Sequence, residues 1–89
     1  MKKRLMTMGK STRHMIFDEI RYKLDNMRKY AGVGDMTEVR IYNKEIEGFV
    51  DALLYTGAIG GLEYHRLYAI KRNTYNECFE TLKTTLKLD

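Results

Sequence analysis

The sequence predicts an all-α fold, a three-helix bundle with a long C-terminal helix and a flexible, basic N-terminal arm. Apolar residues recur at helical spacing in three segments, and glycine-containing turns separate these segments. The composition, 44% apolar and 31% charged residues, is typical of a globular domain and not of a disordered chain. A chain of 89 residues is long enough for one domain, which we place at residues 11–89 after an arm at residues 1–10.

The first helix is predicted over residues 12–31, with Ser11 or Thr12 as its N-cap. Its apolar positions follow a 3.6-residue period, and charged residues occupy the other side of the helix. Gly32 and Gly34 are expected to end it, because glycine adopts the left-handed conformation without a steric cost. The apolar positions are Ile16, Ile20, Leu24, Met27 and Tyr30.

Residues 35–56 allow two interpretations. The alternation of apolar and polar residues at 37–42 is compatible with a strand, but a single strand would have no partner in this chain. Asp35 followed by Glu38 resembles the capping box that begins a helix. Apolar residues also keep helical spacing as far as Leu53, so we favour a helix over residues 35–56.

The third helix is predicted over residues 61–86. Thr74 followed by Glu77 resembles another capping box, so we expect this helix to kink or restart near Asn73. Its apolar face is rich in tyrosine and wider than one neighbouring helix would cover. The chain has one cysteine, Cys78, and therefore no internal disulfide to stabilise a small domain. These features predict a homo-oligomer built on the third helix.

The turn before the third helix has a recognisable pattern: Leu53-Leu54-Tyr55-Thr56-Gly57-Ala58-Ile59, then Glu63, Tyr64 and Leu67. It resembles the short C-terminal-domain hairpins of small bacterial proteins and similar hairpins in small phage proteins. The resemblance covers residues 53–67, and Gly60 or Gly61 stands where those hairpins have Ser or Thr. It implies a glycine-terminated helical hairpin that is used for association more than for chemistry.

The sequence has no pattern typical of an active site, a metal site or a cofactor site. His14, His65 and Cys78 lie far apart and lack the spacing of metal ligands. Cys78 falls on the apolar face of the third helix, so we expect a buried structural thiol there and not a nucleophile. The glycines of residues 57–61 lack a preceding strand and a following Lys-Ser or Lys-Thr, which a phosphate-binding loop requires. We therefore expect a non-enzymatic protein without a cofactor.

Neither an export signal nor a membrane span is predicted. The cations at the start of the chain are not followed by an apolar signal-peptide core. The most apolar stretch, residues 49–62, is shorter than the roughly 20 residues that span a bilayer. The sequence thus predicts a cytoplasmic protein without membrane contact.

One stripe of the third helix combines aromatic and cationic residues at helical spacing. Aromatic rings stack on bases and cations neutralise phosphate, so the stripe predicts a surface for a partner protein or an anionic ligand. The alternative interpretation is the edge of the apolar core, with cationic side chains extending into water. The candidate residues are Tyr64, His65, Tyr68, Lys71, Arg72 and Tyr75.

Charge is distributed unevenly along the chain, with +5 over residues 1–14, −3 over residues 15–65 and +2 over residues 66–89. The main hypothesis is a small regulator or inhibitor, encoded by a phage or mobile element, that binds a partner protein or sequesters a small, nucleotide-like anion. The alternative is a nucleic-acid-binding module that uses the arm together with the stripe of the third helix. The phosphate-contacting residues would then be Lys2, Lys3, Arg4, Lys10 and Arg13.

Overall fold

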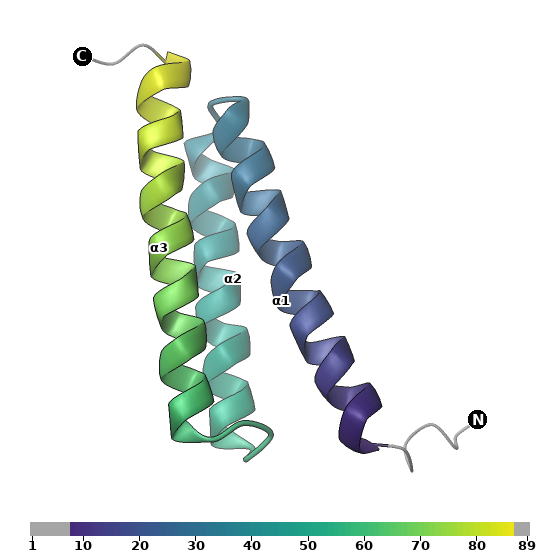
Figure 1. Cartoon of the computed structure of the whole chain (residues 1–89). Helices are drawn as coiled ribbons and strands as arrows, with labels where there is room; N and C mark the ends of the chain where they lie inside the picture. The colour runs from purple at the N-terminus through teal and green to yellow at the C-terminus, as the bar shows by residue number, and fades with distance from the viewer. Residues whose placement is uncertain (1–7, 87–89) are drawn as a thin grey trace.

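The computed structural model describes the backbone of residues 8–86 and the side chains of residues 13–84, and this part contains three helices and no strand (Figure 1). Helix α1 spans Met8–Gly32, α2 spans Met36–Tyr55 and α3 spans Gly61–Leu86. The all-α prediction is confirmed, and residues 37–42 are helical. Residues 1–7 of the predicted arm lie outside the described residues, whereas residues 8–10 belong to α1.

The start of α1 differs from the prediction. The helix begins at Met8, so Ser11 and Thr12 lie inside it and do not cap it. The apolar period that predicts the helix begins only at Ile16. Periodicity therefore carries no information on how far the helix extends ahead of the first core residue.

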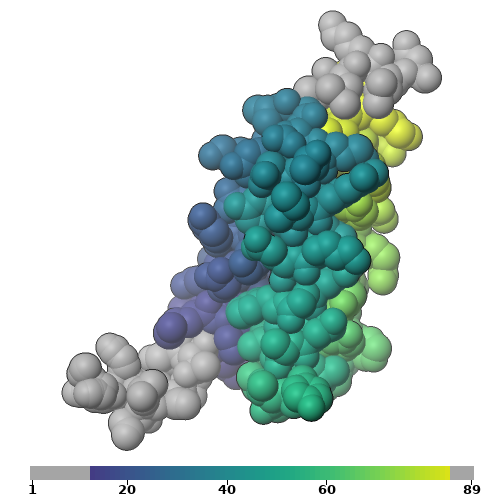
Figure 2. Space-filling model, turned by 180° about the vertical axis from the view of Figure 1, so that it is seen from behind, coloured from purple at the N-terminus to yellow at the C-terminus, as the bar shows by residue number. Residues whose placement is uncertain are grey.

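Each of the three helices packs against the other two, and α2 runs antiparallel to both α1 and α3 (Figure 1); from behind, α2 covers the middle of the molecule (Figure 2). Helices α1 and α3 also contact each other directly, since Arg28 Nη2 donates a hydrogen bond to Thr74 Oγ1 at 3.4 Å. Towards its N-terminus, α1 leans away from α3 (Figure 1). No helix in the described part of the chain is long and apolar enough to cross a membrane.

The first two helices end in the same motif, each with a glycine in the left-handed region. Gly34 has φ 78° and Gly57 has φ 81°. At the end of α1, the Asp35 amide donates to the Tyr30 carbonyl at 2.9 Å, and at the end of α2 the amide of residue 58 donates to the carbonyl of residue 53 at 2.8 Å. These are Schellman caps, which satisfy carbonyls that have no partner within the helix.

Helix α3 begins without a Ser or Thr cap and continues without interruption. Glu63 Oε1 accepts the Gly60 amide at 3.2 Å, which is the carboxylate half of a capping box. The predicted restart near Asn73 is wrong, because one helix runs from Gly61 to Leu86. Thr74 is 3% exposed and lies in the core, where its hydroxyl accepts from Arg28 instead of capping a helix.

The core is formed by one apolar stripe from each helix, together with Ile59, which fills the bend before α3. The stripe of α3 packs against both α1 and α2, so its width is accounted for within one chain. Only Leu62 and Ile70 are large exposed hydrophobic residues among the described residues of α3. The buried apolar residues are Ile20, Leu24, Met27, Ala31, Val39, Ile46, Val50, Ile59, Leu67, Cys78 and Leu82.

We predict opposite effects on stability for alanine at two glycines. Gly57→Ala places a Cβ at φ 81° and is expected to destabilise the fold by about 1–2 kcal/mol. Gly48 lies inside α2 with open space around its Cβ position, so Gly48→Ala is expected to stabilise by about 0.5–1 kcal/mol. Urea denaturation of both variants measures this, and shifts of the same sign would contradict the assignment of Gly57 as a cap.

We also predict that Cys78 is a structural residue. It is 1% exposed, and burial raises the pKa of its thiol, so the native thiol should react with a thiol reagent only after unfolding. Cys78→Ala should cost about 1 kcal/mol and leave the helix content unchanged. Thiol labelling with and without denaturant, beside circular dichroism, checks this; rapid labelling of the native protein would contradict it.

Candidate binding surface between α2 and α3

The tyrosines of the predicted stripe point towards α2 and donate hydrogen bonds to it. Tyr64 Oη donates to Asp51 Oδ1 at 2.8 Å, and Tyr68 Oη donates to the same oxygen at 3.2 Å. Their ring centroids lie 4.9 Å apart. Because one carboxylate accepts from both hydroxyls, these two residues join α2 to α3.

Both hydroxyls remain protonated at physiological pH. The hydrogen bond to Asp51, followed by burial, raises the pKa of Tyr64 above its usual value. Burial, followed by hydrogen bonds to Tyr64 and Asp51, raises the pKa of Tyr68 by a larger amount. The two hydroxyls therefore act as hydrogen-bond donors to Asp51 within the fold.

Lys71 is also directed into the seam between α2 and α3, and its side chain is only 10% exposed. Its Nζ donates to Glu47 Oε2 at 2.8 Å and lies 5.2 Å from the centroid of the Tyr68 ring. The hydrogen bond from Lys71 lowers the pKa of Glu47, although burial acts in the opposite direction. The Lys71 ammonium group is thus already paired with a carboxylate of the same chain.

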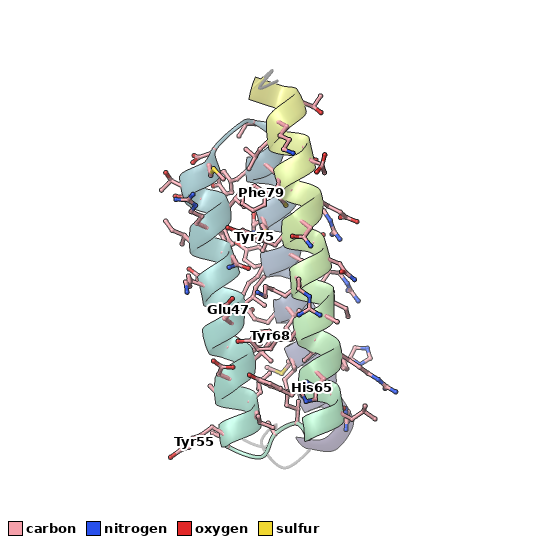
Figure 3. The ribbon with its side chains drawn as sticks, turned by 90° about the vertical axis from the view of Figure 1, so that its left-hand side faces the viewer. Glu47, Tyr55, His65, Tyr68, Tyr75 and Phe79 are labelled. Atoms are coloured by element: carbon pink, nitrogen blue, oxygen red, sulfur yellow. The ribbon has the colours of Figure 1, made fainter. Side chains whose placement is uncertain are left out.

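The other three predicted site residues occupy two different environments. Tyr75 is half-buried and lies with Phe79 between α2 and α3 (Figure 3). The two rings pack edge-on, with their centroids 4.8 Å apart. His65 and Arg72 are exposed. The structure therefore brings Tyr64, Tyr68, Lys71 and Tyr75 together against α2 and leaves the side chains of His65 and Arg72 in solvent.

Sequence reasoning missed the residues of α2 that complete this surface. Asp51 and Glu47 accept the polar hydrogens of α3, and Lys44 Nζ lies 3.6 Å from Glu47 Oε1. The spacing of four residues between Glu47 and Asp51 places both on one face of α2. That spacing was visible in the sequence, but nothing in it indicated which helix the two carboxylates would face.

The cations proposed to contact phosphate fall into three groups. Arg13 Nη1 forms an ion pair with Glu63 Oε2 at 2.7 Å, and both side chains remain partly exposed. Lys10 belongs to the first turn of α1. The predicted contacts Lys2, Lys3 and Arg4 lie outside the described residues. Of these cations, only the side chain of Arg13 has a described position.

The described residues do not assemble a metal site: no three His, Cys, Asp or Glu side chains among them gather as ligands. His14 and His65 are both exposed, and Cys78 is buried in the core. A thiol in that position has no histidine on the same face of α3 to act as its base. Comparison with protein-family models, curated proteins and solved structures finds no match for this chain.

We predict that the contact between Glu47 and Lys71 makes stability depend on pH. The folded-state pKa of Glu47 lies below its ordinary value of 4.5, so its contribution is present above pH 4.5 and is lost as pH falls through the folded value. Glu47→Gln should destabilise the protein by about 1–3 kcal/mol at neutral pH, and this difference should shrink towards zero as the pH falls through the folded-state pKa of Glu47.

The matched control is Glu80→Gln, because Glu80 pairs with Lys83 at 3.7 Å on an exposed face. Exposed pairs contribute about 0–1 kcal/mol, so this variant should show a small effect. Urea denaturation of the three proteins between pH 3 and pH 7 measures the difference. A Glu47→Gln effect that stays constant over this range would contradict the assignment.

Proposed function

We propose that the protein is a small, non-enzymatic binding protein that acts by binding a partner protein through the hairpin end of the bundle. The hairpin end comprises the α2–α3 connection and the neighbouring part of α1. The observation that carries the proposal is the exposure of large apolar residues there, above all Tyr55 at 92% and Leu62 at 65%. The exposed large hydrophobic residues at this end are Met15, Phe17, Leu54, Tyr55 and Leu62.

The ion pair between Arg13 and Glu63 brings α1 to this end of the bundle. Met15 and Phe17 follow Arg13 within one turn and are 69% and 42% exposed. Five of the nine exposed large hydrophobic residues in the described part of the chain thus lie at one end. Scattered apolar residues are normal on a protein surface, but their concentration in one region supports an interaction site.

Tyr55 is the best candidate for an anchor residue. It projects from the end of α2 away from the bundle (Figure 3), and its hydroxyl has no hydrogen-bond partner among the described residues. Tyrosine is enriched among the residues that dominate binding energy, because its ring buries apolar area while its hydroxyl finds a polar partner. Removing Tyr55 should therefore affect binding without affecting the core.

The resemblance of residues 53–67 to short association hairpins supports the same choice of surface. Gly57 ends α2 in the left-handed conformation, Ile59 is 6% exposed in the bend, and Tyr64 returns towards α2. These contacts define the conformation of the hairpin, and a surface whose conformation is set before binding loses less conformational entropy when it binds. We infer that the protein acts as a regulator or inhibitor by occupying its partner's surface.

A second candidate function, nucleic-acid binding, is favoured by the distribution of charge. Residues 13–84 contain eleven cationic and eleven anionic residues, so the excess positive charge lies almost entirely in residues 1–12. A segment without acids can neutralise phosphates and release counterions. In this case, deleting residues 1–10 should abolish binding to a duplex at low salt, whereas binding to a protein through the hairpin end should survive.

We predict that the double variant Tyr55→Ser, Leu62→Ser loses the protein captured from host lysate by the wild-type chain. Affinity should fall about tenfold or more, since anchor residues contribute about 2 kcal/mol or more each. The matched control is Val33→Ser, Ile70→Ser, which removes two residues that are 70% and 46% exposed outside the hairpin end. Quantitative mass spectrometry after nuclease treatment measures capture, and equal loss in both variants would contradict the proposal.

A further inference from the structure

We propose that the half of the α2–α3 seam beyond the contact between Lys71 and Glu47 binds a nucleotide, either free or within a single strand. This surface, which we term the cationic seam, joins two cations of α2 to one cation and two aromatic rings of α3. It adds to the hairpin end a second binding surface of different chemistry. The residues of the cationic seam are Arg40, Lys44, Arg72, Tyr75 and Phe79.

The register of α2 and α3 brings these residues to one surface. Tyr68 contacts Asp51, and Lys71 contacts Glu47. Because the helices are antiparallel, residues nearer the start of α2 lie beside residues nearer the end of α3. One turn beyond Glu47, position 43 of α2 is therefore level with Tyr75 of α3. Two turns beyond Glu47, Arg40 is level with the space between the Tyr75 and Phe79 rings.

Helical spacing places the cations on the outer side of the same seam. Arg40 and Lys44 precede Glu47 by seven and three residues, so all three share one face of α2. Arg72 precedes Tyr75 by three residues and lies beside it on α3. The two rings thus lie between cations contributed by both helices.

The charges of this surface are not balanced within the described residues. Glu47 is shared by Lys71 at 2.8 Å and Lys44 at 3.6 Å, while Arg40 and Arg72 form no ion pair with the described side chains. In the other half of the seam, by contrast, Asp51 holds the hydroxyls of Tyr64 and Tyr68. An anion would therefore be repelled near Asp51 and attracted near Arg40 and Arg72.

A buried polar atom of α2 lies at the same height of the bundle. Asn43 is 8% exposed, and its Oδ1 has no hydrogen-bond partner in the described part of the chain. An unsatisfied buried acceptor destabilises a fold, and such groups are uncommon where a fold is selected for stability alone. By the register of the two helices, Asn43 is level with Tyr75. The unsatisfied acceptor therefore lies at the same height of the bundle as the excess of cations.

These features fit the chemistry of a nucleotide. A ring such as Tyr75 can stack on a base, and arginine presents several donors to phosphate oxygens. A phosphate without a base would engage the cations alone, whereas an apolar partner would leave Arg40 and Arg72 without a role. A nucleotide uses both components of the surface.

Isothermal titration calorimetry of the full chain at low salt tests this proposal with ATP, with an eight-residue thymidine single strand and with tripolyphosphate. Arg40→Gln, Arg72→Gln should weaken binding of the active probe about tenfold or more. Tyr75→Leu should weaken it about 5- to 150-fold, because stacking is lost while apolar volume is retained. Raising the salt concentration should weaken binding further.

The matched control is Lys29→Gln, Arg66→Gln, which removes the same charge from exposed positions outside the seam and should leave binding unchanged. Thermal unfolding monitored by circular dichroism verifies that each variant folds. Binding of ATP alone identifies a free nucleotide as the ligand, and binding of the strand alone identifies a single-stranded nucleic acid. The proposal is overturned by three results: no heat from either probe, equal weakening in the control, or tripolyphosphate binding as tight as ATP.

Discussion

The alignment of α2 with α3 depends on the ammonium group of Lys71. This residue is 8% exposed, and a charge removed from water is tolerated only when an opposite charge and hydrogen bonds replace the lost solvation. Glu47 supplies both at 2.8 Å. Apolar side chains can pack at more than one offset, but a one-turn shift that brings Lys71 level with Asn43 would leave its charge buried without a carboxylate. A one-turn shift in the other direction would bring Lys71 level with Asp51, the carboxylate that accepts from Tyr64 and Tyr68. These polar contacts together favour the observed register, and the register determines which side chains of the two helices meet at the surface.

The sequence predicted the helices well because each buries one stripe, and a stripe on a helix requires the 3.6-residue period visible in the sequence. Gly57 and Asp35 were also predictable, since a left-handed residue and an N-cap place strong demands on residue type. Thr74 shows where local patterns fail. Thr-x-x-Glu resembles a capping box, but tertiary packing turns the Thr74 side chain into the core, where it contacts Arg28.

The candidate surface was predictable in residue type but not in arrangement. The stripe from Tyr64 to Tyr75 lies along α3 as the spacing indicated. Its division into two halves depends instead on α2. Asp51 accepts from Tyr64 and Tyr68, whereas position 43, which is level with Tyr75, is an asparagine. Pairings between residues 13 to 24 positions apart depend on the packing of whole helices, and no local pattern in the sequence encodes them.

Two positions indicate that stability was not the only constraint on this sequence. Leucine at position 43 would remove an unsatisfied buried acceptor, and a polar residue at position 55 would remove a ring that is 92% exposed. Both changes agree with the local requirements of a helix, so the fold does not explain why Asn43 and Tyr55 are present. They lie in separate regions, one in the buried stripe of α2 at the height of the cationic seam and one at the hairpin end. Because neither contributes to the contact between Lys71 and Glu47, either surface can be altered while the register of the bundle is retained.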